Sequence, residues 1–179
     1  MNPKEIEKVE DSLNGILEAL NVRAEVIQEG AVFVLRTATL YGYDSEYEFE
    51  IEPLTETAKS IRDYAAGYDW QEEKGWWKPG QNGAPEEPQL TAEFRNIGGL
   101  MADIELAMDA LLESTAVSTN EDRDRIFDKY KKRLSENHIN SVKEDLDDFL
   151  TMIRGRGFTN QEIIELVTEQ LGGFKWKKP

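Results

Sequence analysis

The feature that most constrains the fold is the segment from Asp44 to Glu52, in which an acidic residue occupies every second position. Apolar residues stand between most of them, namely Tyr47, Phe49 and Ile51. Strict alternation is typical of a β-strand with one buried face, because successive side chains point to opposite faces. The sequence therefore predicts a strand with a uniformly acidic polar face, which carries Asp44, Glu46, Glu48, Glu50 and Glu52.

The spacing of this acidic ladder resembles the spacing of nucleic-acid phosphates. Successive carboxylates on a strand stand roughly 6.7 Å apart, since each residue rises about 3.3 Å. Phosphates rise about 3.4 Å each along the axis and lie further apart along the winding backbone. Because like charges in a row destabilise a strand, the ladder favours a surface that binds a positive partner. The other interpretation is the ordinary solvated face of an edge strand.

The net charge of −15 over 179 residues is concentrated in the first part of the chain. Residues 1–115 contain 24 acidic and 9 basic residues, whereas residues 116–179 contain 12 of each. Such a field disfavours direct binding of nucleic acid or anionic lipid by the first part. It favours a basic protein groove or cations as the partner.

Hydrophobic periodicity predicts the elements around the ladder. A helix is expected from Pro3 to about Asn21, followed by β-rich segments at 23–28 and 31–38 that a Glu-Gly turn joins into a hairpin. With the acidic strand they form an antiparallel meander. We therefore expect an α+β fold, in which helices pack on a small antiparallel three-stranded sheet. Further helices are expected after Pro53, capped by Thr55 or Thr57, and from about Leu90 to Leu111. The long helix is expected to turn its large apolar residues inward, namely Leu90, Phe94, Ile97, Met101, Ile104, Met108 and Leu111.

The second part of the chain is predicted to be a helical subdomain. Residues 114–120 read as a linker, so we expect an acidic α+β domain at 1–115 and a three-helix C-terminal subdomain at 116–179. The second and third helices are each expected to begin with a capping box, Ser141-x-x-Glu144 and Thr159-x-x-Glu162. The second helix is expected to bury Val142, Leu146, Phe149, Leu150 and Ile153.

A long irregular segment at 69–89 contains three tryptophans among several glycines and prolines. Loops of this length are usually functional. The rings of Trp70, Trp76 and Trp77 either complete a small core or anchor a protein interface beside the acidic field. In the second case the partner-binding residues of this segment are Glu72, Glu73, Trp76 and Trp77.

Signals for catalysis are weak. The chain has no cysteine, and its one histidine, His138, has no ligand spacing around it. No phosphate-binding loop or nucleophile motif is present. The acidic pairs Glu144-Asp145 and Asp147-Asp148 lack the spacing of a calcium loop. We expect a non-enzymatic protein without catalytic residues, metal site or cofactor, and a carboxylate-based hydrolase or metal enzyme is the alternative.

Two segments carry a family resemblance: Leu40-Tyr-Gly-Tyr-Asp-Ser-Glu-Tyr-Glu-Phe-Glu-Ile-Glu52, and Ser60-Ile-Arg-Asp-Tyr-Ala-Ala-Gly-Tyr-Asp69. They resemble a group of small acidic proteins of bacterial phages and other mobile elements. The group implies no established activity that transfers to named residues. By analogy of charge and size, however, it suggests the DNA-mimicking anti-CRISPR and antirestriction inhibitors.

The expected function is a mobile-element inhibitor of a host RNA-guided nuclease, an anti-CRISPR whose acidic surface blocks a basic DNA-binding channel. The expected partner is a CRISPR effector nuclease or a restriction enzyme, with no direct DNA binding by the acidic domain. A homodimer is a further option. The alternative function is a phage or plasmid adaptor that binds a partner through its C-terminal helices. With no targeting segment and no apolar run of about 20 residues, the expected location is the cytoplasm of the host bacterial cell.

Overall fold

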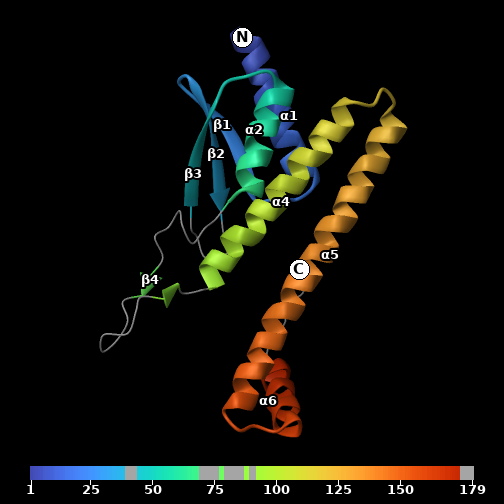
Figure 1. Cartoon of the computed structure of the whole chain (residues 1–179). Coiled ribbons are helices and arrows are strands. Elements are labelled where there is room, and N and C mark those ends of the chain that lie inside the picture. Colours follow the sequence, from blue (N-terminus) through green and yellow to red (C-terminus); the bar gives the residue numbers. More distant parts are fainter. Residues whose placement is uncertain (39–43, 69–76, 79–86, 89–91, 174–179) are drawn as a thin grey trace. The chain divides into compact units, whose positions relative to one another are not determined.

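The computed structural model describes residues 1–38, 44–68, 77–78, 87–88 and 92–173 (Figure 1). Within them lie five helices and a three-stranded antiparallel sheet, so the predicted α+β class is confirmed. The chain divides into two compact units, unit 1 at Met1–Leu134 and unit 2 at Ser135–Pro179. None of the described helices is long and apolar enough to cross a membrane.

Helix α1 (Pro3–Ala19) begins where the sequence predicts, because Asn2 caps its first turn. The Asn2 side chain accepts from the backbone N–H of Glu5 at 3.1 Å, and the Glu5 carboxylate accepts from the N–H of Asn2 at 2.8 Å. These two bonds satisfy donors that a helix start leaves open. The buried face of α1 consists of aliphatic side chains three and four residues apart: Val9, Leu13, Ile16 and Leu17.

The sheet is the predicted meander of β1 (Ala24–Glu29), β2 (Val32–Ala38) and β3 (Asp44–Glu50), in that spatial order. Gly30 turns the β1–β2 hairpin with a φ of 61°, a conformation that glycine adopts without strain. Leu35 of β2 stands opposite Val26 of β1 and Tyr47 of β3, which gives one apolar row across the inner face. All three side chains of this row are buried.

Helices α1 and α2 (Leu54–Ala66) cover the inner face of the sheet, and α4 (Ala92–Thr115) packs against both helices (Figure 1). One hydrophobic core fills the space between these layers. The expected inward residues of the long helix are buried from Ile97 onward, as Met101, Ile104, Met108 and Leu111. The side chains of Leu90 and Phe94 lie outside the described residues.

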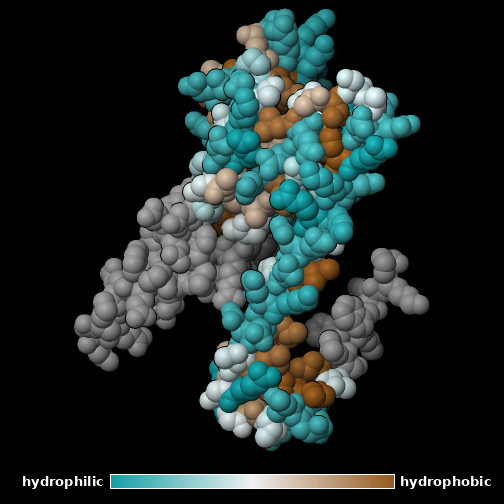
Figure 2. All heavy atoms as spheres, turned by 45° about the vertical axis from the view of Figure 1, so that its right-hand side comes forward, coloured by the Kyte–Doolittle hydropathy of each residue, from teal (hydrophilic) through white to brown (hydrophobic). Residues whose placement is uncertain are grey.

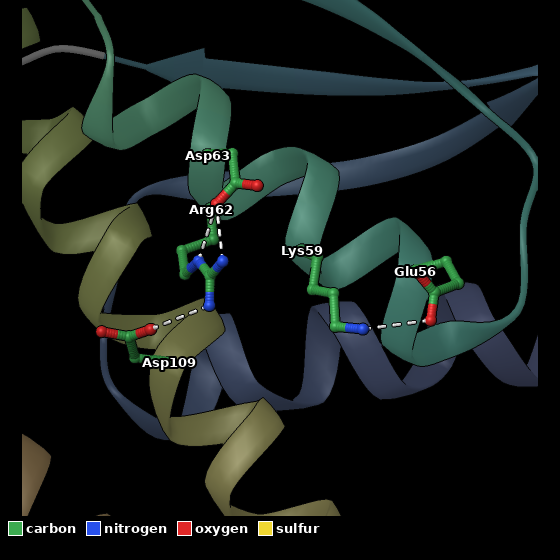
Figure 3. A network of polar contacts seen from close by, with 5 residues as sticks. All are labelled: Glu56, Lys59, Arg62, Asp63 and Asp109. Carbon is green, nitrogen blue, oxygen red and sulfur yellow. Dashed lines mark hydrogen bonds and ion pairs between the residues drawn. The ribbon is translucent and has the colours of Figure 1, made fainter.

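An arginine joins α2 to α4 at the surface of this layer. The Arg62 guanidinium donates two hydrogen bonds to Asp63, at 2.9 and 2.6 Å, and its Nη1 lies 3.8 Å from Oδ1 of Asp109 on α4 (Figure 3). The hydrogen bond to Asp63 is the main reason that the pKa of Arg62 is raised above its ordinary value. One turn earlier in α2, Lys59 pairs with Glu56 at 3.2 Å.

The first part of α5 (Asn120–Gly155) belongs to unit 1 and buries Ile126, Tyr130 and Leu134. The Tyr130 hydroxyl donates to Oε2 of Glu113 on α4 at 3.0 Å, and Lys129 pairs with the same oxygen at 2.7 Å. Burial, followed by the bond to this carboxylate, raises the pKa of Tyr130 to about 12. The hydrogen bond from Lys129 is the largest cause that lowers the pKa of Glu113.

The C-terminal part differs from the prediction, since one continuous helix of 36 residues replaces the first two of the three expected helices. Ser141 and Glu144 lie in the interior of α5 and do not form a capping box. No proline or glycine interrupts residues 120–154, so nothing in the local sequence forces the helix to end. The compact units accordingly divide within α5, after Leu134, rather than at the linker expected near Thr115.

Helix α6 (Asn160–Gly173) begins as predicted. Oε2 of Glu162 accepts from the N–H and the hydroxyl of Thr159, at 2.8 and 2.7 Å, and Thr159 Oγ1 accepts from the N–H of Glu162 at 3.3 Å. The Thr159–Glu162 capping box is therefore confirmed. These bonds favour the ionised carboxylate, so they lower the pKa of Glu162.

Candidate protein-binding surfaces

Strand β3 places the predicted acidic ladder on the outer face of the sheet. The side chains of Tyr47 and Phe49 point inward and contact Tyr64 of α2, with ring centroids 4.9 and 5.7 Å apart. Because side chains alternate along a strand, Glu46, Glu48 and Glu50 point outward, and all three are exposed.

The two end residues of the ladder, Asp44 and Glu52, are not placed on the outer face as the central three are. The backbone of Asp44 opens β3, but its side chain is not among the described ones. Glu52 lies beyond the strand and is half-buried, and its carbonyl accepts from Thr57 Oγ1 at 2.9 Å. The expectation that the strand extends to Glu52 is wrong, because Pro53 caps α2 and the chain leaves the sheet there.

Two further carboxylates, which the sequence prediction did not include, share this face. Strand β1 carries Glu25 and Glu29, which alternate with buried Val26 and therefore point outward, and both are exposed. Glu25 stands opposite Arg36 of β2, which in turn stands opposite Glu46. The alternation of Glu25, Ile27 and Glu29 was the available signal. The acidic outer face, as we call it, consists of Glu25, Glu29, Glu46, Glu48 and Glu50.

Arg36 of β2 lies within the acidic outer face. Arg36 donates through Nε to Glu46 at 2.9 Å and through Nη2 to Glu29 at 2.6 Å. Its side chain is 40% exposed, so these bonds contribute little stability, but they hold two carboxylates in fixed positions. Beside them an open pocket of about 570 Å³ has Arg23, Glu25 and Glu46 in its lining.

Glu48 and Glu50 have no basic residue directly opposite them on β2. Glu48 stands opposite Val34, and Glu50 stands opposite Val32. Within the described part of the chain, neither carboxylate forms an ion pair. Glu48 and Glu50 therefore present two adjacent negative charges to solvent, with no ion-pair partner among the described residues.

The tryptophan segment is largely outside the described residues. This holds for Glu72, Glu73 and Trp76. Trp77 belongs to β4 (Trp77–Lys78), which pairs with β5 (Glu87–Pro88) so that Trp77 is opposite Pro88, and its side chain is not described. The proposed role of these four residues stays a prediction.

Unit 2 carries a second surface, which the sequence prediction placed in a core. Val142, Leu146 and Phe149 are 65%, 52% and 41% exposed, so the expectation that they are buried is wrong. The predicted three-helix core would have covered them, but unit 2 contains only the end of α5 and α6. Figure 2 shows apolar side chains gathered on the surface over these two helices.

Among the described residues, no three acidic or histidine side chains are placed to hold a metal ion together. His138 is exposed on α5. A comparison of the chain with family models, with curated proteins and with solved structures gives no match.

Proposed function

We propose that the protein is an inhibitor that binds a basic nucleic-acid-binding protein through its acidic outer face. The observation that carries this proposal is the adjacent pair Glu48 and Glu50, which are exposed and form no ion pair with the described residues, on a face that also holds Glu25 and Glu29. A groove lined with arginine and lysine, shaped to accept phosphates, has the opposite charge pattern. The partner we propose is a host RNA-guided nuclease, with the protein acting for a mobile element as an anti-CRISPR.

The geometry favours a protein over a metal ion as the partner. Calcium requires six to eight oxygen ligands that surround it. The carboxylates of the acidic outer face are instead spread over one face of the sheet, on β1 and β3, which lie on either side of β2. A flat array of this kind matches a row of basic side chains better than one small cation.

The first test is a charge reversal at Glu48→Lys and Glu50→Lys in the full chain. These side chains are exposed and unpaired in the register, so the variant is expected to fold. It should lose at least tenfold in affinity for a guide-loaded nuclease, and the nuclease should recover DNA binding and cleavage. Binding by the unmodified protein should weaken as salt rises, because the contacts are exposed charges.

A matched control separates local recognition from net charge. Glu7→Lys with Asp11→Lys changes the charge by the same amount on exposed positions of α1. This control should bind and inhibit like the unmodified protein. Equal losses in both variants, or full inhibition by the β3 variant, would contradict recognition through the acidic outer face.

A second candidate function is supported by the exposed apolar side chains of unit 2. An adaptor that binds a different protein through its C-terminal helices would use such a surface. Substitutions at Val142 and Phe149 would then abolish partner binding, while the β3 charge reversal would leave it intact.

A further inference from the structure

The end of α5 carries a continuous apolar stripe on its exposed surface. Ile139, Val142, Leu146 and Phe149 follow one another at intervals of three and four residues, and the same spacing leads to half-buried Ile153. This interval places them on one side of the helix, as in the seam of a coiled coil. Met152 lies beside the stripe and is 48% exposed.

The described residues of unit 2 leave this stripe exposed. Its two helices bury Ile163 of α6 and half-bury Leu150 and Ile153 of α5. Phe158, Ile164 and Leu166 remain 42% to 59% exposed. A helical hairpin of this size has only one internal interface, and chains of about 40 residues usually need an added partner to complete a core.

The exposed apolar area of unit 2, summed over α5, α6 and the turn between them, approaches the size of one side of a protein interface. Eight large apolar side chains of unit 2 are between 41% and 65% exposed, which leaves on the order of 600 Å² of apolar area. The largest patch on an ordinary monomer is roughly 300–600 Å². Each partner in a standard interface contributes about 800 Å².

We propose that a second copy of this chain covers the stripe, so that two hairpins form a four-helix bundle about a two-fold axis. A two-fold interface requires one patch to be complementary to itself. The stripe meets this requirement, because it contains no charged residue and its apolar side chains, three and four residues apart, form ridges and grooves into which an identical set can pack. The proposal is independent of the acidic outer face. Where the proposed inhibition also holds, the dimer carries two such faces and binds a multivalent target more tightly.

The test is the mass of the full chain in solution. Sedimentation equilibrium from micromolar to submillimolar concentration should give twice the chain mass of 20.5 kDa at the upper end. Added salt should strengthen association, because each copy carries a net charge of −15 and the contact is apolar. This response is opposite to that expected for binding a basic partner.

Leu146→Lys with Phe149→Lys should give a monomer at every concentration. The matched control adds the same two lysines at exposed positions outside the stripe, Asn140→Lys with Thr151→Lys, and should remain dimeric. Far-ultraviolet circular dichroism should show the same helix content for all forms. A monomeric unmodified chain, or a dimer that survives the stripe substitutions, would overturn the proposal.

The proposed function and the second-copy interface can be refuted independently of each other. Glu48→Lys with Glu50→Lys should leave the dimer intact, since these residues are not in unit 2. A dimer without nuclease inhibition would refute only the proposed function. Inhibition by a chain that is always monomeric would refute only the second-copy interface.

Discussion

At the scale of single residues, Asn14 and Arg36 organise the sheet through contacts that link separate elements. Asn14 on α1 donates through Nδ2 to the carbonyl of Val26 at 2.7 Å and accepts from the N–H of Val26 at 2.8 Å. A side-chain amide thus takes the place of a neighbouring strand along the free edge of β1. Because Val26 is fully buried, water is a poor substitute for this partner.

Replacement of Asn14 by alanine should therefore destabilise the protein by about 1–3 kcal/mol, the usual effect of leaving buried backbone groups unsatisfied. The free energy of unfolding from urea denaturation measures this loss. Asn140→Ala is the matched control, since it makes the same change at an exposed position of α5. A loss no larger than that of the control would contradict the role assigned to Asn14.

Neither contact was predictable from the sequence. Asn14 lies between Leu13 and Gly15 in an amphipathic helix, which indicates only that it is near the boundary of the apolar face. Its partner is 12 residues away and is defined by the packing of α1 on β1. Arg36 was assigned to a strand, but its pairing with Glu29 and Glu46 depends on the register of three strands.

At the scale of elements, local patterns predicted the three strands and the starts of α1 and α6. They failed at the start of α2, where Pro53 rather than Thr55 or Thr57 is the N-cap, and at the continuity of α5. Alternation fixed the three strands to within a few residues, and the Thr159–Glu162 box was correct because a glycine turn precedes it, with Gly157 at a φ of 91°. The Ser141–Glu144 box has the same spacing but follows helical sequence, so α5 continues through it. The exposed stripe was misassigned for a related reason, because an apolar helical face does not reveal whether its partner belongs to the same chain.

The start of α6 gives a test by pH titration. The pKa of Glu162 is lowered in the folded state, so the stabilising contribution of its ionised form is complete above 4.5, the ordinary value, and is lost as the pH falls through the lowered pKa. Thr159→Ala removes the hydroxyl bonds, and the pKa of Glu162 should move back up towards 4.5 in a side-chain NMR titration.

Thr168→Ala serves as the control for this titration. It removes the same kind of side chain from an exposed position of α6 and should leave the titration of Glu162 unchanged. An unchanged titration in Thr159→Ala would show that the Thr159 hydroxyl does not hold the carboxylate, since the backbone N–H of residue 159 remains in the variant.

At the scale of the whole molecule, charge and apolar surface are distributed unevenly along the chain. The excess of acidic residues lies entirely within residues 1–115, whereas among the described side chains the large exposed apolar ones lie mainly in unit 2. Repulsion among the acidic residues opposes the compact state of unit 1. The sequence showed the charge imbalance directly, but only the structure located the apolar surface.

This imbalance predicts a specific response to ionic strength. Moderate sodium chloride should raise the thermal unfolding midpoint by a few degrees, because screening reduces the repulsion within unit 1. Differential scanning calorimetry at several salt concentrations measures the shift. A midpoint that falls with salt would mean that ion pairs such as Arg36–Glu46 outweigh the repulsion.

The position of β3 at the edge of the sheet has a consequence at acidic pH. Among the described residues, β2 is the strand that pairs with β3, and none pairs with the opposite edge of β3. The backbone N–H and C=O groups of that edge are therefore a template on which a further strand can add. At neutral pH the carboxylates of the segment Asp44–Glu50 repel any identical segment that approaches. Near the isoelectric point of about 4.5 the net charge disappears, and an alternating segment with Tyr47 and Phe49 becomes suited to cross-β stacking. The charges proposed for recognition are thus also expected to oppose fibril growth, and mild acid is expected to remove that protection.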